Sequence, residues 1–338
     1  MTLMAAELAE IPQAAARLLD ETGPALVKAG ARLRARDPGV VLTIARGSSD
    51  HAAAYLKYLV ELAAGVPVAA IGPSVASVYG RPLRAPGAVS VAISQSGRSP
   101  DIIAAQAAAA KGGALTLALT NHPEAPLAAS AGLVLPLAAG PERSVAATKT
   151  FVNACLCAAL LVTEWRADAA LKAALHRVPQ ALAAALRLDW SPLAEALRRA
   201  DSAYVLGRGP GRAIVGEMAL KLKETAALHA EGYSAAEVLH GPAALAEAGF
   251  PVLALAVGDP ARESVEATAE RLAAQGARVF VTGTAEGATR LPGPAPLHPW
   301  LDPVIAIAPF YRMAEALSRA RGLDPDRPRH LTKVTETR

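Results

Sequence analysis

The stretch SVAISQSGRSPD, residues 90–101, ends an apolar run with a cluster of hydroxyl groups, an amide and a glycine. The apolar residues Val89, Val91, Ala92 and Ile93 predict a buried strand, and the Ala- and Ile-rich segment that begins near Pro100 predicts a helix. In open sheets of parallel strands, ligands bind beyond the carboxyl ends of the strands. The stretch therefore predicts a binding loop between a buried strand and a helix.

Similar strand-like and helix-like runs alternate on both sides of this stretch. Residues 3–36 are expected to be helical up to the Asp-Pro-Gly at 37–39, and a long helix is expected at 148–166. This alternation predicts a parallel sheet covered by helices on both faces. The other segments expected in this half are a strand, glycine turn and helix at 40–65, and strands at 66–72, 114–121 and 133–140.

The second half of the chain repeats the first. The run SAYVLGRGPGR matches VVLTIARGSSD, and Gly209 lies 162 positions after Gly47 (209 − 47). VLALAVGDPARE matches SVAISQSGRSPD, with Gly258 lying 161 positions after Gly97 (258 − 97), and ARVFVTG matches ALTLALT. Landmarks at nearly one offset predict an internal duplication, in which only the first copy carries the hydroxyl cluster.

The repeat and the composition around it suggest a division of the chain into five parts. These are a helical segment at 1–36, a first domain at 37–167, a helical connector at 168–199, a second domain at 200–320 and a tail at 321–338.

Composition narrows the class of protein. The 338 residues are 52% hydrophobic and only 4% aromatic, and they carry a formal net charge of +4 without any block of like charge. The apolar content therefore argues against disorder, and a nucleic-acid surface is poorly supported. The longest apolar run, 151–162, is too short to span a bilayer. The N-terminus has neither the basic region nor the apolar core of a signal peptide.

Two cysteines, Cys155 and Cys157, lie close together without a histidine or further cysteine nearby. This spacing indicates small apolar residues on a buried helix rather than a metal site or a disulfide framework. A reducing, cytoplasmic location fits this reading, and we expect no metal ion, no organic cofactor, no nucleic acid and no membrane among the partners.

The hydroxyl cluster suits a phosphate monoester. Ser94, Ser96 and Ser99 offer hydroxyls, Gln95 offers an amide, and Gly97 lets the backbone approach a ligand closely. The loop is not a P-loop, because the pattern G-x-x-x-x-G-K-[ST] is absent. The alternative is an ordinary helix cap followed by turn residues.

Four motifs together resemble the sugar isomerase (SIS) domain family. They are SQSGRSPD at 94–101, ALKLKE at 219–224, EVLHGP at 237–242 and PRHLTK at 328–333. The resemblance covers essentially the whole chain and is strongest to the isomerase half of glucosamine-6-phosphate synthase. It implies an α/β fold of two tandem SIS domains, each a flavodoxin-like three-layer α/β/α sandwich, followed by an active-site tail.

The resemblance also implies roles for individual residues. Glu224 matches the acid/base that moves a proton between C1 and C2, and His240 matches a ring-opening histidine contributed by a neighbouring subunit. Lys333 matches a tail lysine that forms an imine with the open-chain ketose. A homodimer with a shared active site is therefore expected. The matching substrate-binding and supporting positions are Ser48, Ser49, Ser94, Gln95, Ser96, Ser99, Val145, Glu217 and Lys221.

Each of these roles has a plainer alternative. Glu217, Lys221 and Glu224 share one helix face at spacing i, i+4 and i+7, as the charged row of a solvated helix also would. His240 precedes a Gly-Pro pair and could simply end a helix, and Lys333 could be a solvated tail lysine.

The chain also departs from the synthase pattern. Thr2 follows the initiator Met, and no cysteine precedes Cys155, so we expect the chain by itself to lack the glutaminase that makes ammonia from glutamine. Arg98, Arg143 and Ala147 also differ from the synthase pattern.

The leading hypothesis is therefore a stand-alone deaminase that converts glucosamine 6-phosphate into fructose 6-phosphate and ammonia. The alternatives are a fructose-amine 6-phosphate deglycase, another sugar-phosphate isomerase or deaminase, the isomerase subunit of a synthase, and a sugar-phosphate sensor without catalysis.

Overall fold

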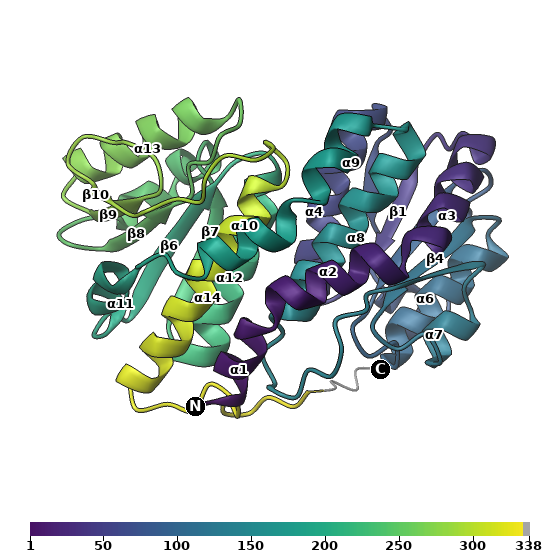
Figure 1. Ribbon diagram of the computed structural model, residues 1–338, viewed down its shortest axis with the longest axis horizontal. Coiled ribbons are helices and arrows are strands. Elements are labelled where there is room, and N and C mark those ends of the chain that lie inside the picture. Colours follow the sequence, from purple (N-terminus) through teal and green to yellow (C-terminus); the bar gives the residue numbers. More distant parts are fainter. Residues whose placement is uncertain (334–338) are drawn as a thin grey trace. The chain divides into compact units, whose positions relative to one another are not determined.

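A computed structural model describes residues 1–333 of the chain (Figure 1). The chain divides into two compact units. The N-terminal unit, as named here, comprises Gln13–Glu142, Lys149–His176 and the tail residues Thr332 and Lys333. The C-terminal unit comprises Met1–Pro12, Arg143–Thr148 and Arg177–Leu331.

The N-terminal unit is built on a five-stranded parallel sheet in the order β2-β1-β3-β4-β5. The predicted buried strand before the serine cluster is β3, and all five of its residues are buried. The sheet confirms the parallel arrangement expected from the alternating runs. Its strands are β1 (Val41–Ile44), β2 (Val68–Ala70), β3 (Val89–Ile93), β4 (Leu115–Thr120) and β5 (Leu133–Pro136).

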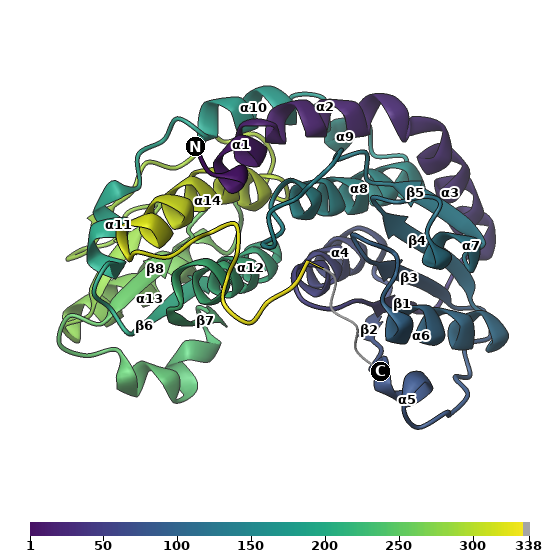
Figure 2. The same cartoon turned by 90° about the horizontal axis from the view of Figure 1, so that it is seen from below.

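Helices cover both faces of this sheet, as Figure 2 shows for α6 and α8. On one face, Ile102, Ala105 and Ala109 of α6 pack with Ile44, Ala92 and other strand residues in one apolar cluster. On the other face, α8 contacts β4 and is flanked by α3 and α4. The helices of this unit are α2 (Ile11–Glu21), α3 (Gly23–Arg36), α4 (Ser48–Ala64), α5 (Ser74–Ser77), α6 (Pro100–Lys111), α7 (Pro126–Ala129), α8 (Lys149–Arg166) and α9 (Ala169–Leu175).

The predicted helical stretch 3–36 is three helices rather than one. Helix α1 (Leu3–Ala9) ends before Glu10, and α2 ends before Thr22. A proline follows each break, Pro12 in the first turn of α2 and Pro24 in the first turn of α3. Proline has no backbone N–H and fits only the first turn of a helix, so each proline marks a new start.

The C-terminal unit contains a second five-stranded parallel sheet, in the order β10-β9-β8-β6-β7. Numbered from the first strand of each copy, both sheets have the flavodoxin-like order 2-1-3-4-5. The predicted duplication is thus confirmed by topology. The strands are β6 (Ser202–Gly207), β7 (His229–Ser234), β8 (Pro251–Ala254), β9 (Arg278–Val281) and β10 (Thr289–Arg290).

The duplication extends to one unusual backbone conformation. Gly47 precedes α4 with φ 56° and ψ −132°, and Gly209 precedes α12 (Pro210–Ala226) with φ 57° and ψ −140°. This region of backbone space is open almost only to glycine. The two glycines that align in the sequence repeat therefore make the same turn between a first strand and its helix.

In the C-terminal unit, α13 covers one face of the sheet, where Val265, Ala269 and Leu272 pack with strand residues. Helices α12 and α14 contact each other, and α12 contacts β6. Two elements of this unit, β7 and the almost wholly buried α14, were not predicted from the sequence. The further helices are α10 (Val178–Ala185), α11 (Ser191–Leu197), α12 (Pro210–Ala226), α13 (Arg262–Ala274) and α14 (Asp302–Ala320), with 3₁₀ turns η1 (Glu237–His240) and η2 (Pro242–Leu245).

The apolar helix α8 carries both cysteines, which are buried as predicted. Burial raises the pKa of the Cys157 thiol to about 12, so this residue stays a protonated thiol. No helix within residues 1–333 combines the length and apolar character needed to cross a membrane.

Candidate active site

Most of the predicted phosphate-binding residues line one pocket of the N-terminal unit, here called the serine pocket. Its volume is about 330 Å³, and it opens at the carboxyl ends of β1 and β3, where α4 and α6 begin. The first turns of two helices therefore border it, and helix N-termini favour anions. The lining residues are Arg46, Gly47, Ser49, Ile93, Ser94, Gln95, Ser96, Ser99, Ile102 and Lys333.

The loop after β3 is held in a tight turn by its own residues. The buried Ser94 hydroxyl accepts a hydrogen bond from the Gly97 N–H at 3.2 Å, and the Ser96 hydroxyl accepts one from the Arg98 N–H at 3.3 Å. Gly97 has a φ of 62°, and a Cβ there would lie 2.8 Å from the Cβ of Ala125. Glycine is therefore required at this position both for its backbone angle and for space.

The alternative of a plain helix cap explains only part of this loop. Ser99 stands at the N-cap position of α6, yet its side chain makes no capping hydrogen bond within the described part of the chain. The Ser99 side chain instead lines the pocket, as does Ser49 from the first turn of α4. Ser48 begins α4 but is not among the residues that line this pocket.

An ion pair that we did not predict joins the loop after β1 to the first turn of α6. The Nε of Arg46 lies 2.5 Å from Oδ2 of Asp101, whose side chain is fully buried while that of Arg46 is half-exposed. The other Asp101 oxygen accepts from the N–H of Ile102 at 2.9 Å. The signal available in the sequence was the charged residue two positions after a strand, in the run ARGSSD.

The tail lysine is held at the same pocket by a second buried carboxylate. The Nζ of Lys333 lies 3.0 Å from Oε2 of Glu142, whose side chain is fully buried. The same Glu142 oxygen accepts the Thr150 hydroxyl at 2.6 Å, and its other oxygen accepts the Thr150 N–H at 3.2 Å. Lys333 is therefore not the solvated tail residue of the alternative reading, and Glu142 is a site residue that sequence reasoning missed.

The charged row on α12 is buried rather than solvated, so the alternative reading of this row was wrong. The side chains of Glu217 and Lys221 are fully buried, and that of Glu224 is 20% exposed. Lys221 lies 3.4 Å from Glu217 and forms an ion pair with Glu224. The Tyr311 hydroxyl of α14 donates to Glu217 at 3.1 Å, a contact that the sequence alone did not indicate.

This surrounding sets the charge of Lys221. Burial by itself would lower the pKa of the ammonium, but attraction to Glu217 and Glu224 outweighs burial, and the pKa of Lys221 rises above its usual value. Lys221 is therefore a cation at neutral pH, and it holds the Glu224 carboxylate in one position at the end of the buried row.

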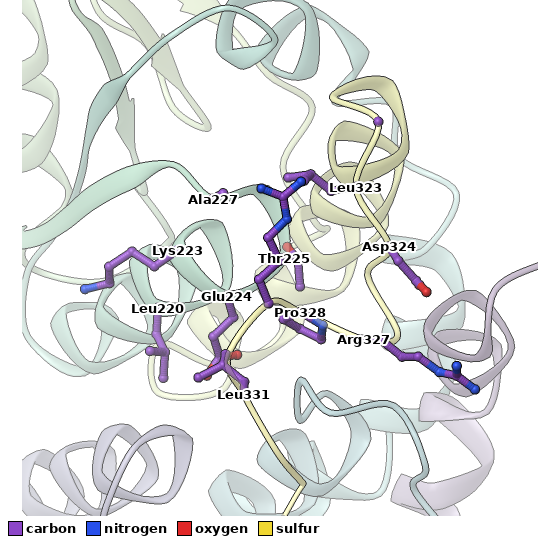
Figure 3. A pocket seen from close by; sticks show the side chains of 12 residues that line it. Leu220, Lys223, Glu224, Thr225, Ala227, Leu323, Asp324, Arg327, Pro328 and Leu331 are labelled. Atoms are coloured by element: carbon purple, nitrogen blue, oxygen red, sulfur yellow. The ribbon is translucent and has the colours of Figure 1, made fainter.

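Glu224 also lines a second pocket, of about 570 Å³, formed within the C-terminal unit by the last turn of α12 and the chain after α14 (Figure 3). Figure 3 shows Glu224 facing Pro328 and Leu331 of that chain. The tail thus covers the candidate acid/base. The lining residues are Leu220, Lys223, Glu224, Thr225, Ala227, Gly322, Leu323, Asp324, Arg327, Pro328, Arg329 and Leu331.

Like Ser48, Glu217 and Lys221, the predicted residues His240 and Val145 line neither pocket. His240 is exposed at the end of η1 and is among the lining residues of neither pocket. Val145 is half-buried, and its N–H donates to the carbonyl of Asp326 at 3.3 Å. Asp326 in turn accepts hydrogen bonds from the N–H groups of Leu3 and Met4 at 2.7 Å each, so this tail residue caps α1.

Comparison with known proteins agrees with this architecture. The sequence model of the SIS domain matches residues 36–164 and 196–289, one stretch for each copy of the repeat. A glutamine–fructose-6-phosphate aminotransferase (isomerizing) of Halobacterium salinarum is 37% identical over 312 residues, which cover 86% of this chain and 50% of the relative. The chain therefore spans about half the length of such curated relatives.

Two solved structures resemble the whole chain. A candidate phosphosugar isomerase from Silicibacter pomeroyi DSS-3 is 48% identical, with a TM-score of 0.93, over 96% of this chain and 100% of that one. A glucosamine-6-phosphate deaminase from Thermotoga maritima shares the fold with a TM-score of 0.79 at 20% identity, over 99% of this chain and 100% of that one. The repeated sheet, the matched segments and these relatives together show that the chain belongs to the SIS domain family and carries two copies of the domain.

Proposed function

We propose that this protein is an amino-sugar-phosphate deaminase that converts glucosamine 6-phosphate and water into fructose 6-phosphate and ammonia. The serine pocket carries this proposal. Four hydroxyls, one amide and two cations line it, and no acidic side chain is among its described lining residues. Such a lining suits a phosphate monoester.

Glu224 has the properties of the proton-transfer group. It is a partly exposed carboxylate at the end of a buried ionic row, and its ion pair with Lys221 holds it in position. In the open-chain aldehyde, a base removes the proton from C2 and returns it to C1, which converts the C2 amine into an imine. Hydrolysis of that imine by water releases ammonia and leaves the ketose.

Lys333 supports the same chemistry. A lysine amine can exchange with the C2 imine, releasing ammonia, and the resulting lysine imine is then hydrolysed to the ketose. Lys333 lines the serine pocket, where its amine is held by Glu142. We propose that this exchange is its role.

His240 is proposed to act in a second copy of the chain. It is an exposed, titratable residue that lines neither pocket of its own chain. An imidazole titrates near neutral pH and can protonate the ring oxygen as the sugar opens. We therefore propose a homodimer in which each subunit lends His240 to the other.

The test is an assay of purified protein with glucosamine 6-phosphate in EDTA, with fructose 6-phosphate and ammonia measured together. We expect equimolar products from the wild type and none from Glu224→Gln. Absence of both products, with the protein still thermally stabilised by sugar phosphates, would reject the deaminase. In that case a panel of galactosamine 6-phosphate, fructose-amine 6-phosphates and ketose 6-phosphates distinguishes another deaminase, a deglycase or isomerase, and a non-catalytic sensor.

A further inference from the structure

The serine pocket carries a residue to which neither the motifs nor the proposed reaction assign a role. Its only charged lining residues among those described are Arg46 and Lys333, and both are cations. Each is held by a carboxylate whose side chain is fully buried and does not line the pocket, Asp101 for Arg46 and Glu142 for Lys333. The ligand therefore meets the cations and not their counter-charges.

We propose that Arg46 binds the phosphate group of the substrate, with Asp101 holding it in place, and thereby selects phosphorylated over uncharged sugars. This inference rests on the proposed sugar-phosphate function and adds a specificity-determining residue to it.

The geometry of Arg46 leaves it free to act on a ligand. A guanidinium has five N–H donors in a planar fork, and Asp101 takes the Nε donor at 2.5 Å. The Arg46 side chain is half-exposed, so donors remain for an anion in the pocket that it lines. Arginine matches the oxygens of a phosphate with two parallel hydrogen bonds, which a lysine cannot form.

Other charges near Arg46 also bear on its role. Asp50, in the first turn of α4, has its pKa raised by burial and lowered by less through attraction to Arg46. Asp50 is not among the residues that line the serine pocket. Neither Asp50 nor Asp101, which pairs with Arg46, is among the lining residues, so neither places a carboxylate where the ligand binds.

The second copy of the repeat provides an internal reference. Arg208 occupies the position of Arg46, directly before the glycine that makes the shared turn. Its Nη1 donates to the Ser264 hydroxyl at 3.0 Å, in the first turn of α13, as Arg46 contacts the first turn of α6. Each arginine connects the loop after the first strand of its sheet to the first turn of a later helix. Only Arg46 makes this contact beside the serine cluster. Arg208→Gln therefore removes the tie without touching the pocket.

The test is calorimetric titration of the full chain with fructose 6-phosphate, inorganic phosphate and unphosphorylated fructose. Arg46→Gln removes hydrogen bonds to a charged group. We therefore expect it to weaken the binding of fructose 6-phosphate and of phosphate by about tenfold to hundredfold. Arg46→Lys should recover part of the loss, and Arg208→Gln should bind as the wild type does. Thermal unfolding of each variant checks that the fold is retained. If Arg46→Gln does not fold, the phosphate affinity of Arg46→Lys is compared with that of the wild type instead. We expect the affinity of Arg46→Lys to be lower, and equal affinity would overturn the role of Arg46.

The outcomes separate this inference from the proposed function. If the wild type and Arg46→Gln bind phosphates with equal affinity, the role of Arg46 is overturned and the proposed function stands. Equal weakening by Arg208→Gln would show that Arg46 is only a structural tie. A wild type that binds neither phosphate nor fructose 6-phosphate would overturn both.

Discussion

The ammonium of Lys333 lies 3.0 Å from the Oε2 atom of Glu142, the same oxygen that accepts the Thr150 hydroxyl at 2.6 Å. Two hydrogen bonds from Thr150 thus fix the Glu142 carboxylate to the first turn of α8, independently of its contact with the tail. Glu142 and Lys333 are 191 positions apart in the chain, and bringing them together has an entropic cost that their contact must offset. The relationship makes Glu142 a positioning residue for Lys333.

Glu142→Gln should therefore lower kcat by about a hundredfold, since a displacement of about 1 Å in a reacting group can have that effect. Trapping of the lysine imine distinguishes this positioning role from a purely structural one, which would leave the amount of trapped imine unchanged. Sodium borohydride added with fructose 6-phosphate should label Lys333 in the wild type and much less in Glu142→Gln. Glu164→Gln removes a partly exposed pair with Lys172 in the same unit and serves as the control. Undiminished labelling in Glu142→Gln would refute the positioning role.

Lys221→Met should destabilise the fold strongly. The change leaves the fully buried Glu217 without its cation, and breaking a buried pair in this way typically costs about 3–5 kcal/mol. Lys172→Met, which removes a pair whose lysine is 51% exposed, should cost less than about 1 kcal/mol. The free energy of unfolding from urea titration measures both, and similar small losses in the two variants would contradict the buried-pair argument.

The same lysine predicts a dependence of stability on alkaline pH. The pKa of Lys221 is raised above 10.5 in the folded protein, so the charged form is favoured by folding. This contribution is complete below pH 10.5, the usual pKa of the group, and is lost as the pH rises through the folded pKa. The difference in unfolding free energy between wild type and Lys221→Met should thus be constant from neutral pH to about pH 10 and shrink above that. A difference that stays constant to pH 12 would argue against a charged Lys221.

Gly97→Ala should disturb the serine pocket more than Gly47→Ala. Both glycines have positive φ, 62° and 56°, so alanine is strained by about 1–3 kcal/mol at either site. Only at Gly97 would the added Cβ also meet other atoms, at 2.8 Å from Ala125 and 3.0 Å from Thr120, because nothing lies within 4 Å at Gly47. Urea unfolding and fructose 6-phosphate titration should show the larger loss in Gly97→Ala; equal losses would mean that space at Gly97 is not limiting.

Mixing two inactive variants tests the proposed shared site. Glu224→Gln and His240→Ala proteins, unfolded together and refolded as a mixture, should form hybrid dimers with one complete site each. Random pairing makes half of the dimers hybrid, so about a quarter of the wild-type activity should return. The same mixture without refolding is the control for subunit exchange. Failure to recover activity, with hybrid dimers demonstrated by mass spectrometry, would exclude a histidine lent between subunits.

The sequence was informative where function depends on local pattern. The run from β3 into α6 contains its own strand, turn glycine and hydroxyls, and the serine pocket uses most of them. The duplication was also readable, because Gly47 and Gly209 must adopt a backbone conformation that other residues avoid. Breaks at Pro12 and Pro24 within the N-terminal helical stretch could have been predicted from the same local rules.

The sequence by itself thus determined the α/β class, the repeat and the identity of the hydroxyl loop, since strand periodicity and glycine geometry act over a few neighbouring residues. Only the tertiary structure decided that the Glu217–Lys221–Glu224 row is buried, that Asp101 holds Arg46 and that Glu142 holds Lys333. A solvated charged row and a buried one have the same helical spacing. Which of them forms depends on what packs against the helix, here α14, whose Tyr311 lies 94 positions further along the chain than Glu217.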